Sequence, residues 1–190
     1  MKFERVITLP YDRKAGPVPV DHLLNGEVES LDAANCQRVV QLLFSGMGMP
    51  LGREKMLSME AFSGLGEPVI INQEHGGLSL HDIIRFGNNL DVVFAELLYT
   101  KDGEPIVRNG HWDDLRTKSL HMGVLTYDHV VHSHLQGGTG SFDHLQKFME
   151  RYSVVGLRRL DTSTAPNVDS FLQFSAGRIS EQYPPGHYPQ

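Results

Sequence analysis

Apolar residues recur along the chain with two different spacings, which predict helices first and strands later. After Ser30 and Asp32, either of which would cap a helix, the apolar side chains fall at positions i, i+3, i+4, i+7 and i+8. This is the spacing of one buried helix face, made of Cys36, Val39, Val40, Leu43 and Phe44. The helix is expected to end near the glycines at 46 and 48.

Shorter periodic segments predict two more helices and a set of strands. The sequences REKMLSMEAF and LSLHDIIRFG are typical of short helices, with the strand-like VII between them. Strands are predicted over 91–98, 120–127 and 130–135. A Gly-rich turn then leads to the predicted helix FDHLQKFMERY and a last strand over 153–160. Helices followed by antiparallel strands, with no βαβ alternation, predict an α+β fold.

Composition and charge exclude several classes of function. The 190 residues, 40% of them hydrophobic, suffice for one core of ordinary size. With 17 basic and 23 acidic residues, the net charge is -6, and no Lys/Arg cluster could follow a phosphate backbone, so nucleic acid is not an expected partner. No segment approaches the ~20 apolar residues of a membrane helix. We expect a soluble, cytoplasmic protein, unless a route without a signal peptide exports it.

The single cysteine is the first candidate for chemistry. It cannot form an internal disulfide, so Cys36 is either part of the core or chemically active. It falls within about the first six residues of the predicted helix, where free N–H groups and the helix dipole stabilise a thiolate. It also lies on the apolar stripe, where cysteines are commonly inert, so this position leaves both interpretations open.

Candidate histidines lie on the predicted hairpin SLHMGVLTYDHVVHSHL. If its YD dipeptide forms a two-residue turn, His121 faces His134 and lies diagonally from His132, within side-chain reach. One imidazole can then accept the thiol proton of Cys36 while a second fixes its tautomer and direction. The alternative is that these histidines lie on the surface of an edge hairpin and have no catalytic role.

The same hairpin also allows a metal site. His129, His132 and His134 follow one another on a predicted strand, and imidazoles at alternating positions can converge on one ion. His132 and His134 share a face of that strand, whereas His129 falls on the other face by simple alternation. A His-ligated metal enzyme is therefore an alternative to the thiol mechanism, which itself requires no metal or organic cofactor.

The order of four motifs resembles the NlpC/P60 family of cysteine peptidases. That family has a cysteine opening a helix, a strand beginning Gly-Asp-[LV]-V-F, a His-[VM]-Gly-[IV] sequence, and an apolar pair followed by His and a small residue. Here these motifs read NC at 35–36, LDVVF at 90–94, HMGV at 121–124 and VVHS at 130–133. Two departures are the sequence NCQR in place of the usual Asp-Cys-Ser-Gly, and Leu90 in place of the glycine.

The resemblance covers roughly residues 30 to 160 and implies a papain-like α+β core, in which the helix carrying the cysteine packs on an antiparallel sheet. Residues 1–29 and 161–190 would then be N-terminal and C-terminal extensions. By the same resemblance, Cys36 is the nucleophile, His121 the general base and His132 the third polar residue.

The function implied by this resemblance is hydrolysis of amide bonds in cell-wall-type peptides, with small peptides or peptidoglycan fragments as substrates. Asp91 stands in the strand motif, and we expect it to fix a turn and not to take part in catalysis. Some relatives are inactive, so the alternative is a binding or scaffold module that kept the fold and lost the activity.

Overall fold

A computed structural model of the chain describes residues 36–49, 51, 58–72, 77–99, 120–133 and 140–182. Several sequence-based expectations concern residues outside these ranges. They are the N-terminal extension over 1–29, the two candidate helix caps, the asparagine before Cys36, the start of the REKMLSMEAF helix and His134.

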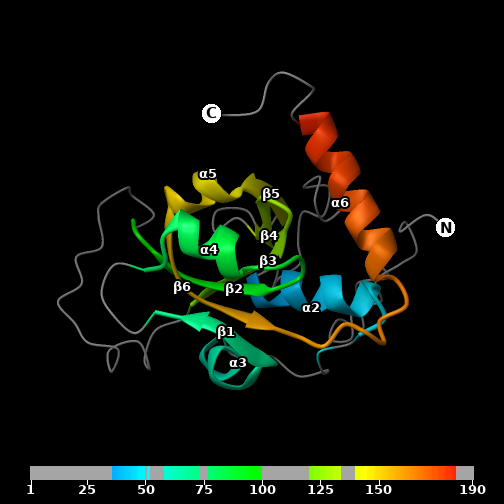
Figure 1. Cartoon of the computed structure of the whole chain (residues 1–190), viewed down its shortest axis with the longest axis horizontal. Helices are drawn as coiled ribbons and strands as arrows, with labels where there is room; N and C mark the ends of the chain where they lie inside the picture. Colours follow the sequence, from blue (N-terminus) through cyan, green and yellow to red (C-terminus); the bar gives the residue numbers. More distant parts are fainter. Residues whose placement is uncertain are drawn as a thin grey trace, which may run out of the picture.

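A six-stranded antiparallel sheet forms the centre of the fold, with helices packed against it (Figure 1). In chain order the strands are β1 Glu67–Ile71, β2 Val92–Leu97, β3 His121–Thr126, β4 His129–Ser133, β5 Gly140–His144 and β6 Tyr152–Arg159. They lie in the order β1-β6-β2-β3-β4-β5. The expected α+β class with an antiparallel sheet is therefore confirmed.

Helices cover both faces of this sheet. Those described are α2 Cys36–Gly46, α3 Ser58–Gly64, α4 Leu80–Phe86, α5 Leu145–Met149 and α6 Val168–Gln182. In the parts of the chain that the structure describes, no helix combines the length and the apolar character required to cross a bilayer. α6 lies in the segment expected to be a C-terminal extension, and its Phe171 is fully buried in the core.

Alternation along the strands divides the core into two parts. Val92 and Phe94 of β2 join the cluster under α2, whereas Val93 and Ala95 join the cluster that contains α4 and α5 residues. We call these two sides of the sheet the α2 face and the α5 face. The stripe predicted for the first helix is confirmed, because its five apolar residues are all buried on the α2 face.

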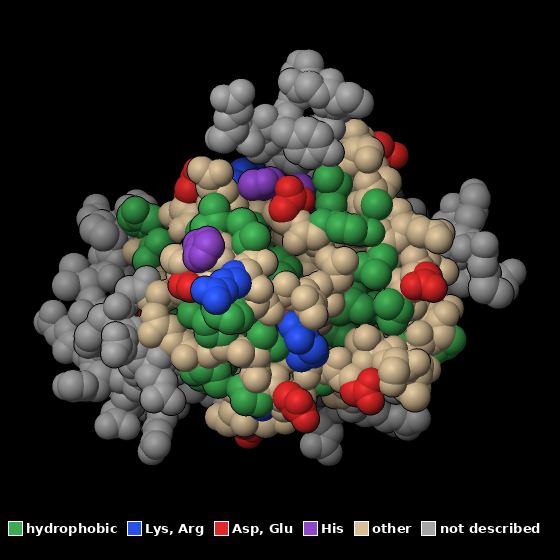
Figure 2. Space-filling view, in the orientation of Figure 1, with side chains coloured by type: hydrophobic (Ala, Val, Ile, Leu, Met, Phe, Trp, Pro, Cys, Tyr) green, Lys and Arg blue, Asp and Glu red, His purple; other side chains and the backbone are tan. Residues whose placement is uncertain are grey.

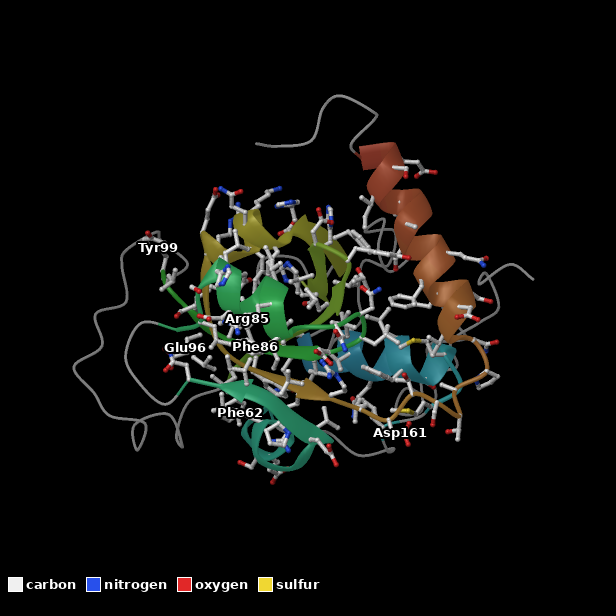
Figure 3. All side chains as sticks on the ribbon, viewed as in Figure 1. Phe62, Arg85, Phe86, Glu96, Tyr99 and Asp161 are labelled. Atoms are coloured by element: carbon white, nitrogen blue, oxygen red, sulfur yellow. The ribbon has the colours of Figure 1, made fainter. Side chains whose placement is uncertain are left out.

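The surface over α4 carries both apolar and charged side chains. Figure 2 shows hydrophobic and charged side chains interspersed on the face of the molecule that carries this helix. Ile84 is 66% exposed, and the guanidinium carbon of Arg85 lies 5.0 Å from the ring centroid of the partly exposed Phe86 (Figure 3). The Ser79 side chain and Asp82 form a capping box that starts this helix.

The expected turn before β2 is also present. The buried carboxylate of Asp91 accepts a hydrogen bond from the backbone N–H of Asn88 at 2.8 Å, and Arg159 donates to both of its oxygens at 2.8 Å. Leu90 has a φ of 73°, in the left-handed region that favours glycine. Asp91 therefore fixes the turn, as the sequence predicted.

One local prediction is wrong in a way that affects the site. A helix is predicted over 142–152, but residues 142–144 belong to strand β5, and α5 extends only from Leu145 to Met149. β5 pairs with β4 along its whole length, from His129↔His144 to Ser133↔Gly140. The edge of β4 supplies hydrogen-bond partners that make the strand more favourable than a helix for these residues.

Candidate active site

The β3–β4 hairpin has the register that the sequence predicted. Its turn occupies residues 127 and 128, and the pairs include Thr126↔His129 and Gly123↔His132. This register brings His121 and His132 together diagonally, with Nε2 of His121 2.9 Å from Nδ1 of His132. Both side chains are almost completely buried, at 5% and 0% exposed. The predicted contact between the two imidazoles is confirmed.

Gly123 makes room for this contact. It lies directly opposite His132, and a Cβ atom on it would be 2.5 Å from Cγ1 of Val130 and 3.2 Å from Cβ of His132. Because the glycine has no side chain, the ring of His132 can lie over β3 and meet His121. The glycine of the HMGV motif thus serves the geometry of the histidine pair.

Aromatic rings hold the two imidazoles on the α5 face. Tyr152 stacks on His121 with ring centroids 4.3 Å apart and an interplanar angle of 13°. Phe148 meets His132 edge-on, with centroids 4.9 Å apart. Burial raises the pKa of Tyr152 to about 12, and the negative charge of a Cys36 thiolate adds to this effect. Cys36 is therefore within electrostatic range of the ring that covers His121.

Cys36 approaches the same place from the other side of the sheet. Its thiol donates to the carbonyl oxygen of Leu120 over 3.8 Å, and the backbone N–H of Met122 also points at the sulfur. These two backbone groups flank His121 in sequence. The hydroxyl of Ser58 accepts a hydrogen bond from the N–H of Leu120 at 2.9 Å, which fixes this part of the chain before β3.

Burial raises the pKa of the Cys36 thiol, whose side chain is 8% exposed. Smaller opposing effects come from the backbone N–H groups of Met122, Gln37 and Cys36 itself, which lower the pKa. The start of α2 does stabilise the thiolate, as the sequence suggested, but desolvation is the larger effect. The thiol is therefore mainly protonated at neutral pH and needs a base to become a nucleophile.

Asp143 is a site residue that the sequence interpretation missed. Its Oδ2 lies 3.2 Å from Nε2 of His132, and the residue is 5% exposed. The ammonium of Lys147 lies 3.7 Å from its other oxygen, Oδ1. Asp143 was assigned to a helix, which hid its position beside β4. The alternation Ser-Phe-Asp at 141–143, typical of a strand, was the available signal.

The structure therefore brings Cys36, His121 and His132 to one place, but their hydrogen bonds do not link all three. His121 and His132 are hydrogen-bonded to each other, and Asp143 extends the series. Cys36 contacts the backbone on both sides of His121, and its hydrogen bond goes to Leu120 and not to an imidazole nitrogen.

A second histidine cluster lies at the turn end of the same strands. Nδ1 of His129 is 2.7 Å from Oδ1 of Asp128, and Nε2 of His144 is 3.4 Å from Oδ2. Burial lowers the pKa of His129, while its hydrogen bond to Asp128 opposes that shift. His129 contacts the ring of Phe142 on the α2 face, away from His132.

The predicted metal trio is thus divided between two places. His129 belongs to the Asp128 cluster, His132 to the Asp143 series, and His134 lies outside the described residues. Within the ranges that the structure describes, no group of three or more His, Cys, Asp or Glu side chains is arranged to hold a metal ion.

No protein-family model matches the chain, and no curated protein is similar to it in sequence. The functional assignment therefore depends on the geometry of the site and on the motif resemblance.

Proposed function

We propose that the protein is a thiol-dependent amide hydrolase of the NlpC/P60 type, with Cys36 as nucleophile, His121 as general base and His132 as the residue that orients the base. The observation that carries this proposal is the convergence on His121. The sulfur of Cys36 lies against the peptide groups on both sides of this residue, and His132 is hydrogen-bonded to its Nε2. A nucleophile, a base and an orienting group are the three parts that such chemistry requires.

Two backbone features support the resemblance to this family and its papain-like core. Leu90 stands where the family has glycine, and it adopts the positive φ that glycine tolerates best. Gly123 of the HMGV motif lies opposite His132, where no side chain would fit without displacement. Both motifs therefore have a local structural reason in this chain.

The reaction would proceed in two steps. His121 accepts the proton of Cys36 as the sulfur attacks the carbonyl carbon of the amide, and N–H groups at the start of α2 stabilise the charge on the carbonyl oxygen. His121 then gives this proton to the leaving nitrogen as the C–N bond breaks, which leaves a thioester on Cys36. Water, deprotonated by His121, hydrolyses the thioester and restores the thiol.

The proposed substrates are small peptides or peptidoglycan fragments, as the resemblance implies. No cofactor is needed, because the sulfur carries the covalent intermediate.

A scaffold module without activity is the second candidate function. The observation that favours it is the thiol itself, because Cys36 is buried, has a raised pKa and donates to a backbone carbonyl. An inert core cysteine would have the same properties.

Alkylation of the protein by iodoacetamide at different pH values separates these two functions. Cys36 is the only cysteine, so the adduct mass reports on this residue alone. If His121 is its base, the wild type reacts near neutral pH, whereas His121→Ala, whose thiol keeps the pKa raised by burial, reacts only above the ordinary thiol pKa of ~8.5. His144→Gln is the control and should react like the wild type. Equal, slow alkylation of the wild type and His121→Ala would support the scaffold function and overturn the hydrolase.

A further inference from the structure

The hydrogen bonds of the site continue beyond the proposed catalytic residues. From the inside outward, Nε2 of His121 meets Nδ1 of His132 at 2.9 Å, and Nε2 of His132 meets Oδ2 of Asp143 at 3.2 Å. All three residues are at most 5% exposed. Each histidine uses one nitrogen toward the next member of the series, so the protonation of one ring constrains the other.

Two acceptors compete for the ring proton of a neutral His132. Its Nε2 faces the carboxylate of Asp143, while its Nδ1 lies 3.2 Å from the carbonyl oxygen of Ser133 as well as near His121. A proton on Nδ1 would leave Nε2 and the carboxylate facing each other as two acceptors. A proton on Nε2 instead makes a charge-assisted hydrogen bond, which is about twice as strong as a neutral one.

A proton on Nε2 of His132 also determines the tautomer of His121. When His132 carries its proton on Nε2, its Nδ1 is an acceptor, and Nε2 of His121 must be the donor. The neutral ring of His121 then has its lone pair on Nδ1. This is the nitrogen that can accept a proton from a thiol while Nε2 remains bonded to His132.

We propose that Asp143 is a positioning residue that sets the tautomers of both histidines, placing the His132 proton on Nε2 and the basic lone pair of His121 on Nδ1. The tautomers follow from the geometry alone. Only the use of Nδ1 as the base for Cys36 depends on the function proposed above.

The position of Asp143 suits this role. It lies on β5, whose pairing with β4 holds Asp143 opposite Val130, and the side chain is buried on the same face as the two imidazoles. Lys147, one turn further along the chain, contacts Oδ1 and leaves Oδ2 for His132. The carboxylate is therefore held by its strand and by an ammonium on one side, with the imidazole on the other.

Asp143→Asn should reverse both tautomers. The ammonium of Lys147 favours the amide oxygen on its own side, which turns the amide NH₂ toward Nε2 of His132. Nε2 then has to accept, and the His132 proton moves to Nδ1. Nε2 of His121 becomes an acceptor in turn, its proton moves to Nδ1, and the lone pair needed by Cys36 is lost.

Long-range ¹H–¹⁵N correlation spectra of histidine side chains distinguish the two neutral tautomers and the imidazolium. At pH 7.5, the wild type should show Nε2–H for both His121 and His132, with the signals assigned through His121→Gln and His132→Gln. Asp143→Asn should show Nδ1–H for both. Asp128→Asn, which removes another carboxylate from two histidines of the same sheet, should leave His121 and His132 unchanged.

A wild-type spectrum with His132 as the Nδ1–H tautomer or as an imidazolium would overturn the proposal, even if Asp143→Asn does not fold. So would unchanged tautomers in a folded Asp143→Asn. Alkylation of Cys36 near neutral pH is the second readout, and it should be about a hundredfold slower in Asp143→Asn, because the base is lost. Tautomers as predicted with a wild-type thiol that stays inert would contradict the hydrolase but leave the role of Asp143 intact.

Discussion

The strands β3 to β5 carry two clusters with the same composition, each made of two histidines and one aspartate, yet the two are built differently. In the Asp143 cluster, the groups are joined in series, His121 to His132 to Asp143, and all are buried on the α5 face. In the Asp128 cluster, the carboxylate stands in the middle, binds both imidazoles and is 47% exposed.

The order of the groups decides what each cluster can do. A series with the carboxylate at one end fixes the ring proton of each histidine and leaves a basic nitrogen at the other end, on His121, whose neighbouring peptide groups contact Cys36. A carboxylate between two imidazoles uses both oxygens as acceptors and ties β4 and β5 to the turn. The first arrangement suits proton transfer, and the second suits holding a hairpin in place.

The largest expected difference between the clusters concerns catalysis. His121→Ala and His132→Gln should each lower kcat/KM on a peptide amide substrate by about 10²-fold or more, because general-base catalysis is lost or misdirected. His144→Gln, in the Asp128 cluster, should change kcat/KM by no more than a few-fold. Steady-state kinetics on the three variants measures this. Similar losses of kcat/KM in all three would show that the two clusters do not differ in catalysis.

The aromatic cover of the Asp143 cluster gives a stability effect at high pH. Because the pKa of Tyr152 is raised from 10.0 to about 12, the unfolded chain loses this proton first, and stability falls as the pH rises between these values. A shift of this size corresponds to roughly 2–3 kcal/mol. Urea unfolding at pH 9 and pH 12 should show this extra loss in the wild type and not in Tyr152→Phe. Tyr127→Phe, at a half-exposed tyrosine, is the control that should keep it.

A methyl group at Gly123 tests the fit of the histidine pair. Gly123→Ala places a Cβ atom 2.5 Å from Val130 and should destabilise the fold by about 1–3 kcal/mol while displacing His132. Gly177→Ala adds the same methyl group in the middle of α6, with nothing within 4 Å, and should stabilise the fold by about 0.5–1 kcal/mol. Urea unfolding gives both free energies. A stabilised Gly123→Ala would show that there is room for a methyl group between Gly123 and Val130.

The smallest effect belongs to the Asp128 cluster at low pH. Burial lowers the pKa of His129 from 6.5, so the unfolded chain binds the proton first and stability is lost as the pH falls below 6.5. His129→Gln should weaken this dependence between pH 7 and 5. Asp128→Asn should strengthen it, because it removes the hydrogen bond that raises the pKa. The free energy of unfolding, measured across this pH range, tests both expectations. If it depends on pH in the same way for the wild type and His129→Gln, His129 does not cause the loss of stability.

Much of the site was predictable because its parts are encoded locally. The stripe containing Cys36 follows helical spacing, and the hairpin turn at 127–128 fixes the diagonal pair His121 and His132 without knowledge of the remaining fold. The stripe predicted the burial of Cys36, but not the backbone groups that its thiol meets, since these depend on how α2 meets the start of β3, 84 residues away in sequence.

The residues that the sequence did not reveal owe their positions to distant partners. β5 forms because β4 offers an edge, so Asp143 reaches His132 through pairing that local periodicity does not encode. Arg158 is similar, because its burial and its partners are not visible in the local sequence. It is 6% exposed, and its guanidinium donates to the carbonyl oxygens of Phe62, Leu65 and Gly66, at the end of α3.

The meander of β3, β4 and β5 also bears on the order in which the site assembles during folding. His121, His132 and Asp143 lie within one stretch of chain, 121–144, whose hairpins close short loops at low entropic cost. The thiol of Cys36 reaches Leu120 only across a separation of 84 residues. The imidazoles can therefore be in register before α2 docks, so the refolding protein should form the His121–His132 pair first and bring Cys36 to it last.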